Sequence, residues 1–231
     1  MLLLTFLLAC APHYPGPTRW IGQVPPAPPP AVESTDEQPA PPAAPTPPPP
    51  PRAEPPEDAR LGAAMGAAAE HYLAHAPKGF RTDCSGFVMA CGARAGVPLS
   101  GSSADLWDRA RAAHAIHHRK LPKVGDIAFF DNTYDRDKDG RWDDDLTHVA
   151  VVIAVSEAGD ILLAHAGTSR GRSELRMNLK RPDEARDERG VVNDYLRSPG
   201  RDEDKERYLA SHLWRGFATL HTDDLETWTT P

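Results

Sequence analysis

The feature that most constrains this chain is a proline-rich stretch over residues 11–60, which holds 19 of its 25 prolines. Proline fixes its own φ angle and lacks a backbone N–H, so the runs at 25–30 and 47–51 disfavour helices and strands and favour extended polyproline II. We therefore expect 11–60 to be a disordered linker. The folded domain is expected over residues 61–220, with a tail at 221–231.

Residues 1–10, Met-Leu-Leu-Leu-Thr-Phe-Leu-Leu-Ala-Cys, form an apolar run at the start of the sequence. A transmembrane helix needs about 20 apolar residues, so this run is too short to span a bilayer. Leu7-Leu8-Ala9-Cys10 resembles a bacterial lipobox, whose cysteine is lipidated, although no Lys or Arg precedes the run. We expect lipidated Cys10 to tether the chain to a membrane of the bacterial cell envelope, on the periplasmic side. An accidental hydrophobic terminus is the alternative.

Charge and cysteine spacing exclude two further features. The formal net charge is −7 and no basic stripe is present, so nucleic acid is not an expected partner. Cys84 and Cys91 lie seven residues apart on one predicted helix. That spacing corresponds to a rise of roughly 10.5 Å, beyond the ~7 Å between Cα atoms that a disulfide tolerates. We expect no disulfide between them.

The remaining pattern places helices before strands, which predicts an α+β fold. Ala-rich residues predict the first helix, and polar capping residues precede the next two, Thr82 or Asp83 for the second and Ser102 or Ser103 for the third. A charge-rich stretch at 181–207 predicts a loop or a surface helix. The helices are expected over 61–75, 84–95 and 103–118, and the strands over 127–130, 148–155, 161–166 and 213–220.

Cys84 is the candidate nucleophile, since it lies at a predicted helix N-terminus. Unpaired N–H groups and the helix dipole there favour a thiolate, so we expect a lowered pKa for Cys84. The N–H groups of Cys84 or Ser85 could bind an oxyanion, and Gly86 would leave room for a substrate backbone. A thiol nucleophile also needs a histidine base that is oriented by a third group.

Two histidines on the predicted hairpin meet that need. If residue numbers in paired positions sum to 315, Val155 lies opposite Asp160 and His165 lies diagonal to His148 on the same face. A register shifted by one residue would place the two histidines on opposite faces. In the expected register, the hairpin presents both histidines to a helix packed on that face.

Four blocks resemble, in order, those of the NlpC/p60 family of cell-wall cysteine peptidases. They are Asp83-Cys84-Ser85-Gly86-Phe87-Val88, Gly125 to Phe130, Thr147-His148-Val149-Ala150-Val151-Val152, and His165-Ala166-Gly167-Thr168-Ser169. The resemblance implies a papain-like α+β fold with Cys84 as nucleophile, His148 as general base and His165 as orienting residue. It covers about residues 61–220.

The same resemblance implies a peptidoglycan hydrolase, a thiol endopeptidase that cleaves amide bonds in stem peptides and requires no cofactor for catalysis. We expect a monomer whose partners are the stem peptides and, through Cys10, the membrane. Residues 75–82 depart from the aromatic, Trp-Gly-Gly-like segment that the family carries before its nucleophile, with Tyr72 the nearest upstream tyrosine. A CHAP-type amidase or endopeptidase and a non-catalytic wall-binding scaffold are the alternatives.

Two further groups could bind metals. Asp135, Asp137, Asp139, Gly140 and Asp143 match positions of a calcium loop, but Leu146 stands where the bidentate Glu belongs, so Asp144 or Asp145 would have to substitute. A structural calcium ion here would stiffen the loop that leads to His148; a solvated acidic turn is the alternative. The histidines at 114, 117 and 118 are interpreted as a solvated helix end rather than a metal site.

Overall fold

The computed structural model describes residues 55–197 and 208–229. The expected lipidation site, Cys10, and almost all of the predicted linker lie outside these residues. The elements are the helices α1 (Glu57–Ala74), α2 (Cys84–Arg94), α3 (Ser103–Ala112), α4 (Ala210–Leu213), η1 (Thr222–Asp224) and α5 (Leu225–Thr229), and the strands β1 (Ile116–His117), β2 (Ile127–Phe130), β3 (His148–Val155), β4 (Ile161–Thr168), β5 (Gly171–Met177), β6 (Arg186–Asp187), β7 (Gly190–Val191) and β8 (Trp214–Ala218).

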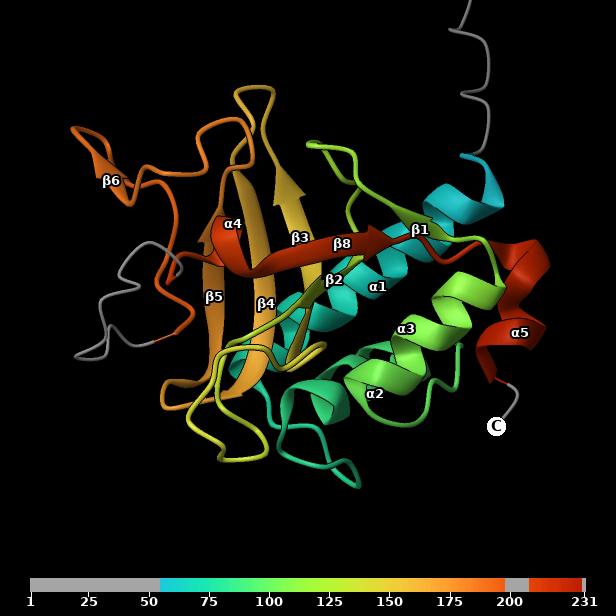
Figure 1. The fold of residues 1–231 in the computed structure, drawn as a ribbon. Helices are drawn as coiled ribbons and strands as arrows, with labels where there is room; N and C mark the ends of the chain where they lie inside the picture. Colours follow the sequence, from blue (N-terminus) through green and yellow to red (C-terminus); the bar gives the residue numbers. More distant parts are fainter. Residues whose placement is uncertain (1–54, 198–207, 230–231) are drawn as a thin grey trace, which may run out of the picture. The chain divides into compact units, whose positions relative to one another are not determined.

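Six strands form one antiparallel sheet in the order β1-β8-β2-β3-β4-β5 (Figure 1). The expected α+β class is confirmed, and the arrangement agrees with a papain-like fold. Strand β5 was not predicted; it continues from β4 through a tight turn. Strand β8, near the end of the chain, lies between β1 and β2 and so inside the sheet.

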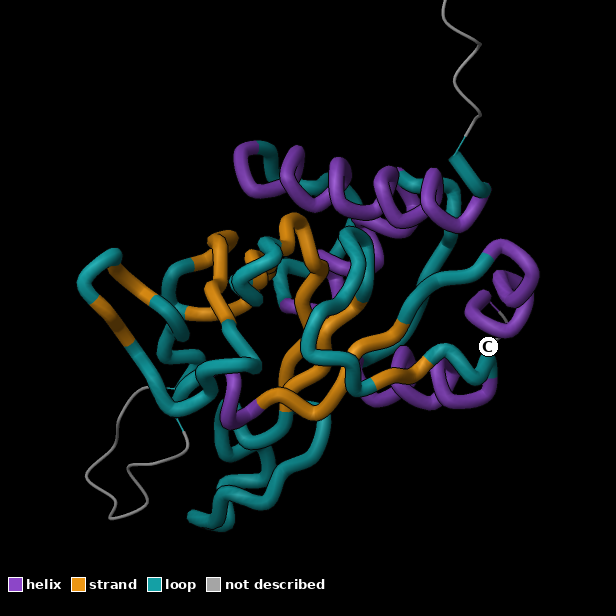
Figure 2. The backbone as a smooth tube through the Cα atoms, turned by 90° about the horizontal axis from the view of Figure 1, so that it is seen from above, coloured by secondary structure: helices purple, strands orange, loops and turns teal. Residues whose placement is uncertain are grey.

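Each face of the sheet has its own core. Alternation along β2 sends Ile127 and Phe129 to one face and Ala128 and Phe130 to the other. The first face packs against α1, α2, α3 and α5, and Figure 2 shows α1 running along this side of the sheet. The second face is covered by apolar residues of α4 and by Leu179 and Leu196 from the long segment after β5.

The ends of the helices follow local chemistry. Helix α1 begins after Pro56, four residues earlier than expected, and carries Glu57 and Asp58 in its first turn, where the helix dipole favours acids. Helix α3 begins with the predicted Ser102 cap, which forms a capping box with Asp105.

Helix α3 ends at Ala112, not near residue 118. His114 adopts a left-handed conformation with φ of 51°, and the N–H of Ala115 donates to the carbonyl of Ala110. This is the Schellman geometry that closes a helix C-terminus, in which glycine is the usual left-handed residue. Because histidine takes that position here, the sequence carries no glycine signal for the end of the helix.

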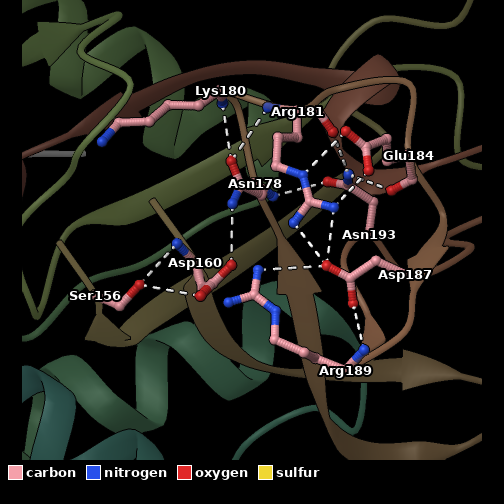
Figure 3. A network of polar contacts seen from close by, with 9 residues as sticks. All are labelled: Ser156, Asp160, Asn178, Lys180, Arg181, Glu184, Asp187, Arg189 and Asn193. Carbon is pink, nitrogen blue, oxygen red and sulfur yellow. Dashed lines mark hydrogen bonds and ion pairs between the residues drawn. The ribbon is translucent and has the colours of Figure 1, made fainter. Parts of the chain in front are cut away.

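The charge-rich segment after β5 is a structured loop with a short β6–β7 hairpin in its described part, and no surface helix. Figure 3 shows the polar network that holds it. The Asn178 side chain accepts from the N–H groups of Lys180 and Arg181, and the Asn193 amide donates to the carbonyls of Arg181 and Glu184. The Arg181 guanidinium pairs with Glu184 and Asp187.

The segment predicted to be a tail contains η1 and α5, and Trp228 is fully buried in the helix-side core. Asp58 of α1 accepts from the N–H of Thr222 at 2.8 Å, which ties this segment to the first helix. Among the residues that the structure describes, no helix has both the length and the apolar character needed to cross a membrane.

Candidate active site

Cys84 is the first residue of α2, and the residues before it fix the helix start. Asp83 is the cap: its carboxylate accepts from the N–H of Gly86 at 2.7 Å. The Arg81 guanidinium lies 3.1 Å from the same carboxylate. A Cβ on Gly86 would lie 2.1 Å from the carbonyl oxygen of Arg81. Gly86 therefore serves close packing of the helix start, rather than the substrate approach that we expected.

The two histidines lie at neighbouring ends of β3 and β4. Near the turn the strands pair Val155 with Ile161, one residue off the expected register. A bulge at Ile153 corrects the offset, so that Val151 pairs with Ala164 in the expected sum of 315. The register is thus wrong at the turn and right toward the histidines, whose relative placement depends on this bulge.

Both histidines lie on the sheet face away from α1 and α2. Alternation groups His148 with Ala150 and Val152, and His165 with Leu163, all on the face that α4 covers. A helix does pack on this face, as expected, but it is α4, whereas α2, which carries Cys84, packs on the other face. The start of α2 lies at the end of the sheet where β3 begins (Figure 1). Cys84 and His148 line one cavity there.

A line of hydrogen bonds runs across three strands. His148 Nε2 lies 2.8 Å from His165 Nδ1, and both rings are buried. His165 Nε2 lies 3.1 Å from the hydroxyl of Ser173 on β5. Because Nε2 of His148 is bonded to His165, Nδ1 is the nitrogen that remains for the thiol.

Cys84 and His148 line one cavity of about 570 Å³. His165 stands behind His148, as an orienting residue would, and is not part of the lining. Tyr72 does not line the cavity either. Sequence reasoning named several of the other lining residues but did not identify Thr133, Tyr134, Arg136 or Leu196 as part of a site. The rest of the wall is made by Arg81, Asp83, Ser85, Ser102, Ser103, Ala104, Thr133, Tyr134, Arg136, Leu146, Thr147, Gly167, Ser169 and Leu196.

Burial favours the neutral forms of the Cys84 thiol and of both imidazoles. It raises the pKa of the Cys84 thiol, against hydrogen bonds from the Val149 backbone and the Ser85 hydroxyl that lower it. Burial also lowers the pKa of His148 to about 3 and that of His165 to about 4. The expected lowering of the Cys84 pKa is thus reversed, because loss of hydration outweighs the effect of the helix N-terminus.

Gly167 brings the end of β4 against the nucleophile. Its φ is 86°, and a Cβ there would lie 2.8 Å from the backbone nitrogen of Cys84. A side chain would therefore stand over the N–H group that we expect to bind the oxyanion. The sequence placed this glycine in the last family block but gave no reason for it.

The acidic loop brings together only part of the predicted metal group. Carboxylate oxygens of Asp135, Asp137 and Asp144 lie within 4.8 Å of one another, whereas Asp139 and Asp143 are not in this group. The Asp144 carboxylate also accepts from the N–H of Arg136 at 2.8 Å. The calcium site stays a prediction, with Asp144 in the substituting role.

The other groups are structural. His117 lies on β1 and bonds the buried carboxylate of Asp126 at 3.0 Å, so it is not at a helix end. Cys91 is fully buried in the helix-side core, and burial raises its pKa to about 12. Cys84 and Cys91 are both free thiols, as expected.

The fold and the site together define a class: an α+β domain in which a cysteine at a helix N-terminus shares a cavity with a histidine on the adjoining sheet. Comparison with protein families agrees, since the model of the CHAP domain matches residues 75–167. The CHAP domain is a cysteine- and histidine-dependent amidohydrolase or peptidase domain related to NlpC/p60. The matched range includes Cys84, His148 and His165. No curated protein and no solved structure matched the chain.

Proposed function

We propose that this chain is a peptidoglycan hydrolase, a thiol endopeptidase that cleaves amide bonds in stem peptides. One observation carries the proposal: Cys84 and His148 line the same cavity, and His165 is bonded to Nε2 of His148. The CHAP match supports a hydrolase acting on the cell wall. The roles of Cys84, His148 and His165 are those that the family resemblance implied.

The reaction begins from a neutral thiol and a neutral imidazole. The Cys84 proton moves to His148 Nδ1 as the sulfur attacks the amide carbon, and the backbone N–H of Cys84 stabilises the oxyanion. His148 then gives the proton to the leaving amine, and the acyl group remains on Cys84 as a thioester. Water loses a proton to His148 and attacks the thioester, which releases the carboxylic acid and restores the thiol.

The test is digestion of purified sacculi by the full chain, with mass spectrometry of the soluble fragments. Cleavage within the stem peptide is expected from the wild type and from Cys91→Ala, whose thiol lies away from the cavity on the same helix. Cys84→Ala should release no fragments. Equal products from wild type and Cys84→Ala would overturn the proposal.

A CHAP-type amidase is the second candidate, since the matching family includes amidohydrolases as well as peptidases. An amidase would release whole stem peptides from the glycan, whereas an endopeptidase leaves part of each peptide attached. A non-catalytic scaffold would bind sacculi and release nothing. The same mass spectra distinguish these three outcomes.

We also propose that Cys10 is lipidated and tethers the chain to a membrane of the cell envelope. The support is the lipobox-like run Leu7-Leu8-Ala9-Cys10, which lies outside the described residues. Cys10→Ser should move the protein from the membrane fraction to the soluble fraction of cells that express the full chain. Membrane association of the Cys10→Ser variant would contradict lipidation.

A further inference from the structure

Ser173 lies behind the histidine pair, outside the cavity that holds Cys84. It stands directly opposite His165 in the β4–β5 pairing, and its hydroxyl is 3.1 Å from His165 Nε2. His165 Nδ1 in turn lies 2.8 Å from His148 Nε2. Hydrogen bonds thus connect Ser173, through both imidazole rings, to the one nitrogen of His148 that remains for the thiol.

When both rings are neutral, the protons along this series of hydrogen bonds can be arranged in two ways, which we call proton orders. In the first, His165 carries its proton on Nε2 and donates it to the Ser173 hydroxyl, so that its Nδ1 accepts from Nε2–H of His148. In the second, the Ser173 hydroxyl donates to His165 Nε2, and Nδ1–H of His165 donates to His148. A neutral imidazole has one donor and one acceptor nitrogen, so the order at Ser173 determines the state of His148.

Only the first order gives Cys84 a base. It leaves His148 Nδ1 unprotonated and able to take the thiol proton, whereas the second order places a proton on that nitrogen. The charged groups that act on His165 from neighbouring segments are Asp194, which raises its pKa, and Arg170, which lowers it. The negative charge of Asp194 favours the positive charge that the histidine pair acquires when the thiol proton arrives.

We propose that Ser173 is a positioning residue: by accepting from His165 Nε2–H, it holds His148 in the tautomer whose Nδ1 can receive the proton of Cys84. A serine hydroxyl can donate or accept, so the choice of the first order rests on the proposed thiol chemistry. The proton order itself can be measured without any substrate. Hydroxyl-bearing residues at position 173 should preserve this order.

The first experiment reads the tautomers directly in the full chain labelled with nitrogen-15 histidine, by correlating each ring nitrogen with the ring protons. In the wild type and in Ser173→Thr, His148 should show a protonated Nε2 and an unprotonated Nδ1. In Ser173→Ala, signals of the opposite tautomer should appear. A protonated His148 Nδ1 in the wild type, or tautomers unchanged in Ser173→Ala, would overturn the proposal.

The second experiment measures hydrolysis. Since one neutral hydrogen bond is lost, Ser173→Ala should lower kcat about 3- to 10-fold. KM should not change, because Ser173 does not line the cavity, and Ser173→Thr should restore kcat. Ser156→Ala is the matched control: it removes the two hydrogen bonds between the serine hydroxyl and Asp160 at the β3–β4 turn, and should leave kcat unchanged.

A mutant cycle tests whether Ser173 acts through His165. In a His165→Ala background, adding Ser173→Ala should cause no further loss of kcat; an equal loss in both backgrounds would overturn the positioning role. If the wild type cleaves no sacculi but shows the expected tautomers and their shift in Ser173→Ala, the proposed function fails while the proton order stands.

Discussion

Gly167 shows how a single residue without a side chain can shape a reaction site. The family block that contains it was recognised from the sequence, but the reason for glycine is visible only in three dimensions. The left-handed conformation and the approach to the Cys84 nitrogen both require the absence of a Cβ. Gly171, four residues later, also has a positive φ of 70°, but a Cβ there would contact nothing within 4 Å.

These two glycines form a matched pair for mutation. Alanine at either position should cost about 1–2 kcal/mol of stability for the left-handed conformation. Only Gly167→Ala should also obstruct the oxyanion donor, with a loss of about 10²-fold in kcat. The measurements are urea denaturation and sacculus hydrolysis of both variants. A loss of kcat in Gly171→Ala as large as in Gly167→Ala would contradict this account.

The sequence predicted which residues form the candidate site better than it predicted their pKa values. Cys84 and His148 were singled out and do line one cavity. The lowered thiol pKa was expected because a helix N-terminus is visible in the sequence, while the depth of burial is not. Ser173 was missed because the β4–β5 turn was not recognised. Even with that hairpin in place, pairing arithmetic from Thr168 and Gly171 at the turn would have set Glu174 opposite His165, since a register shift between His165 and Thr168 is what brings Ser173 there.

At the scale of elements, hydrophobic runs predicted the central strands well, because β-branched residues and flanking turns mark them in the sequence. The bulge at Ile153 has no such mark, because it lies within an unbroken run of apolar residues. The end of α3 was missed for a similar reason, as His114 takes a left-handed position that glycine usually signals. Both errors concern backbone geometry that many different amino-acid sequences can adopt, so the residue types do not reveal it.

The loop after β5 depends on Arg181, which bonds the side chains of both Glu184 and Asp187. These partners raise the pKa of Arg181 further above its ordinary value. Arg181→Ala should lower Tm and speed proteolysis within residues 178–193. Lys180→Ala, which removes a single bond to the carbonyl of Glu157, is the control and should change both less. Equal proteolysis rates in the two variants would contradict this role.

At the scale of the whole molecule, the buried histidines link stability to pH. The pKa values of His148 and His165 are about 3 and about 4 in the folded protein. The ordinary value of about 6.5 applies when the chain unfolds. The unfolded state therefore binds more protons at mildly acidic pH. Their contribution to stability is complete above about pH 6.5 and is lost as the pH falls toward these folded values.

Each of these histidines should make the free energy of unfolding fall by about 1.4 kcal/mol per pH unit in that window. Urea denaturation of the full chain at several pH values from about 7 to about 5 measures the slope. A His165→Gln variant should show a shallower slope than the wild type, because one of the two groups no longer titrates. Parallel slopes for the two proteins would show that His165 is not held neutral by burial.

The position of β8 inside the sheet has a consequence for the order in which the molecule can be built during synthesis. Residues 214–218 fill the gap between β1 and β2, so the ribosome must release nearly the whole described domain before the sheet can close. Until then β2 has a bare edge able to pair with other chains. Because these contacts span long stretches of sequence, closure should be a slow late step. Shortening the chain before Trp214 would make that vulnerable intermediate permanent.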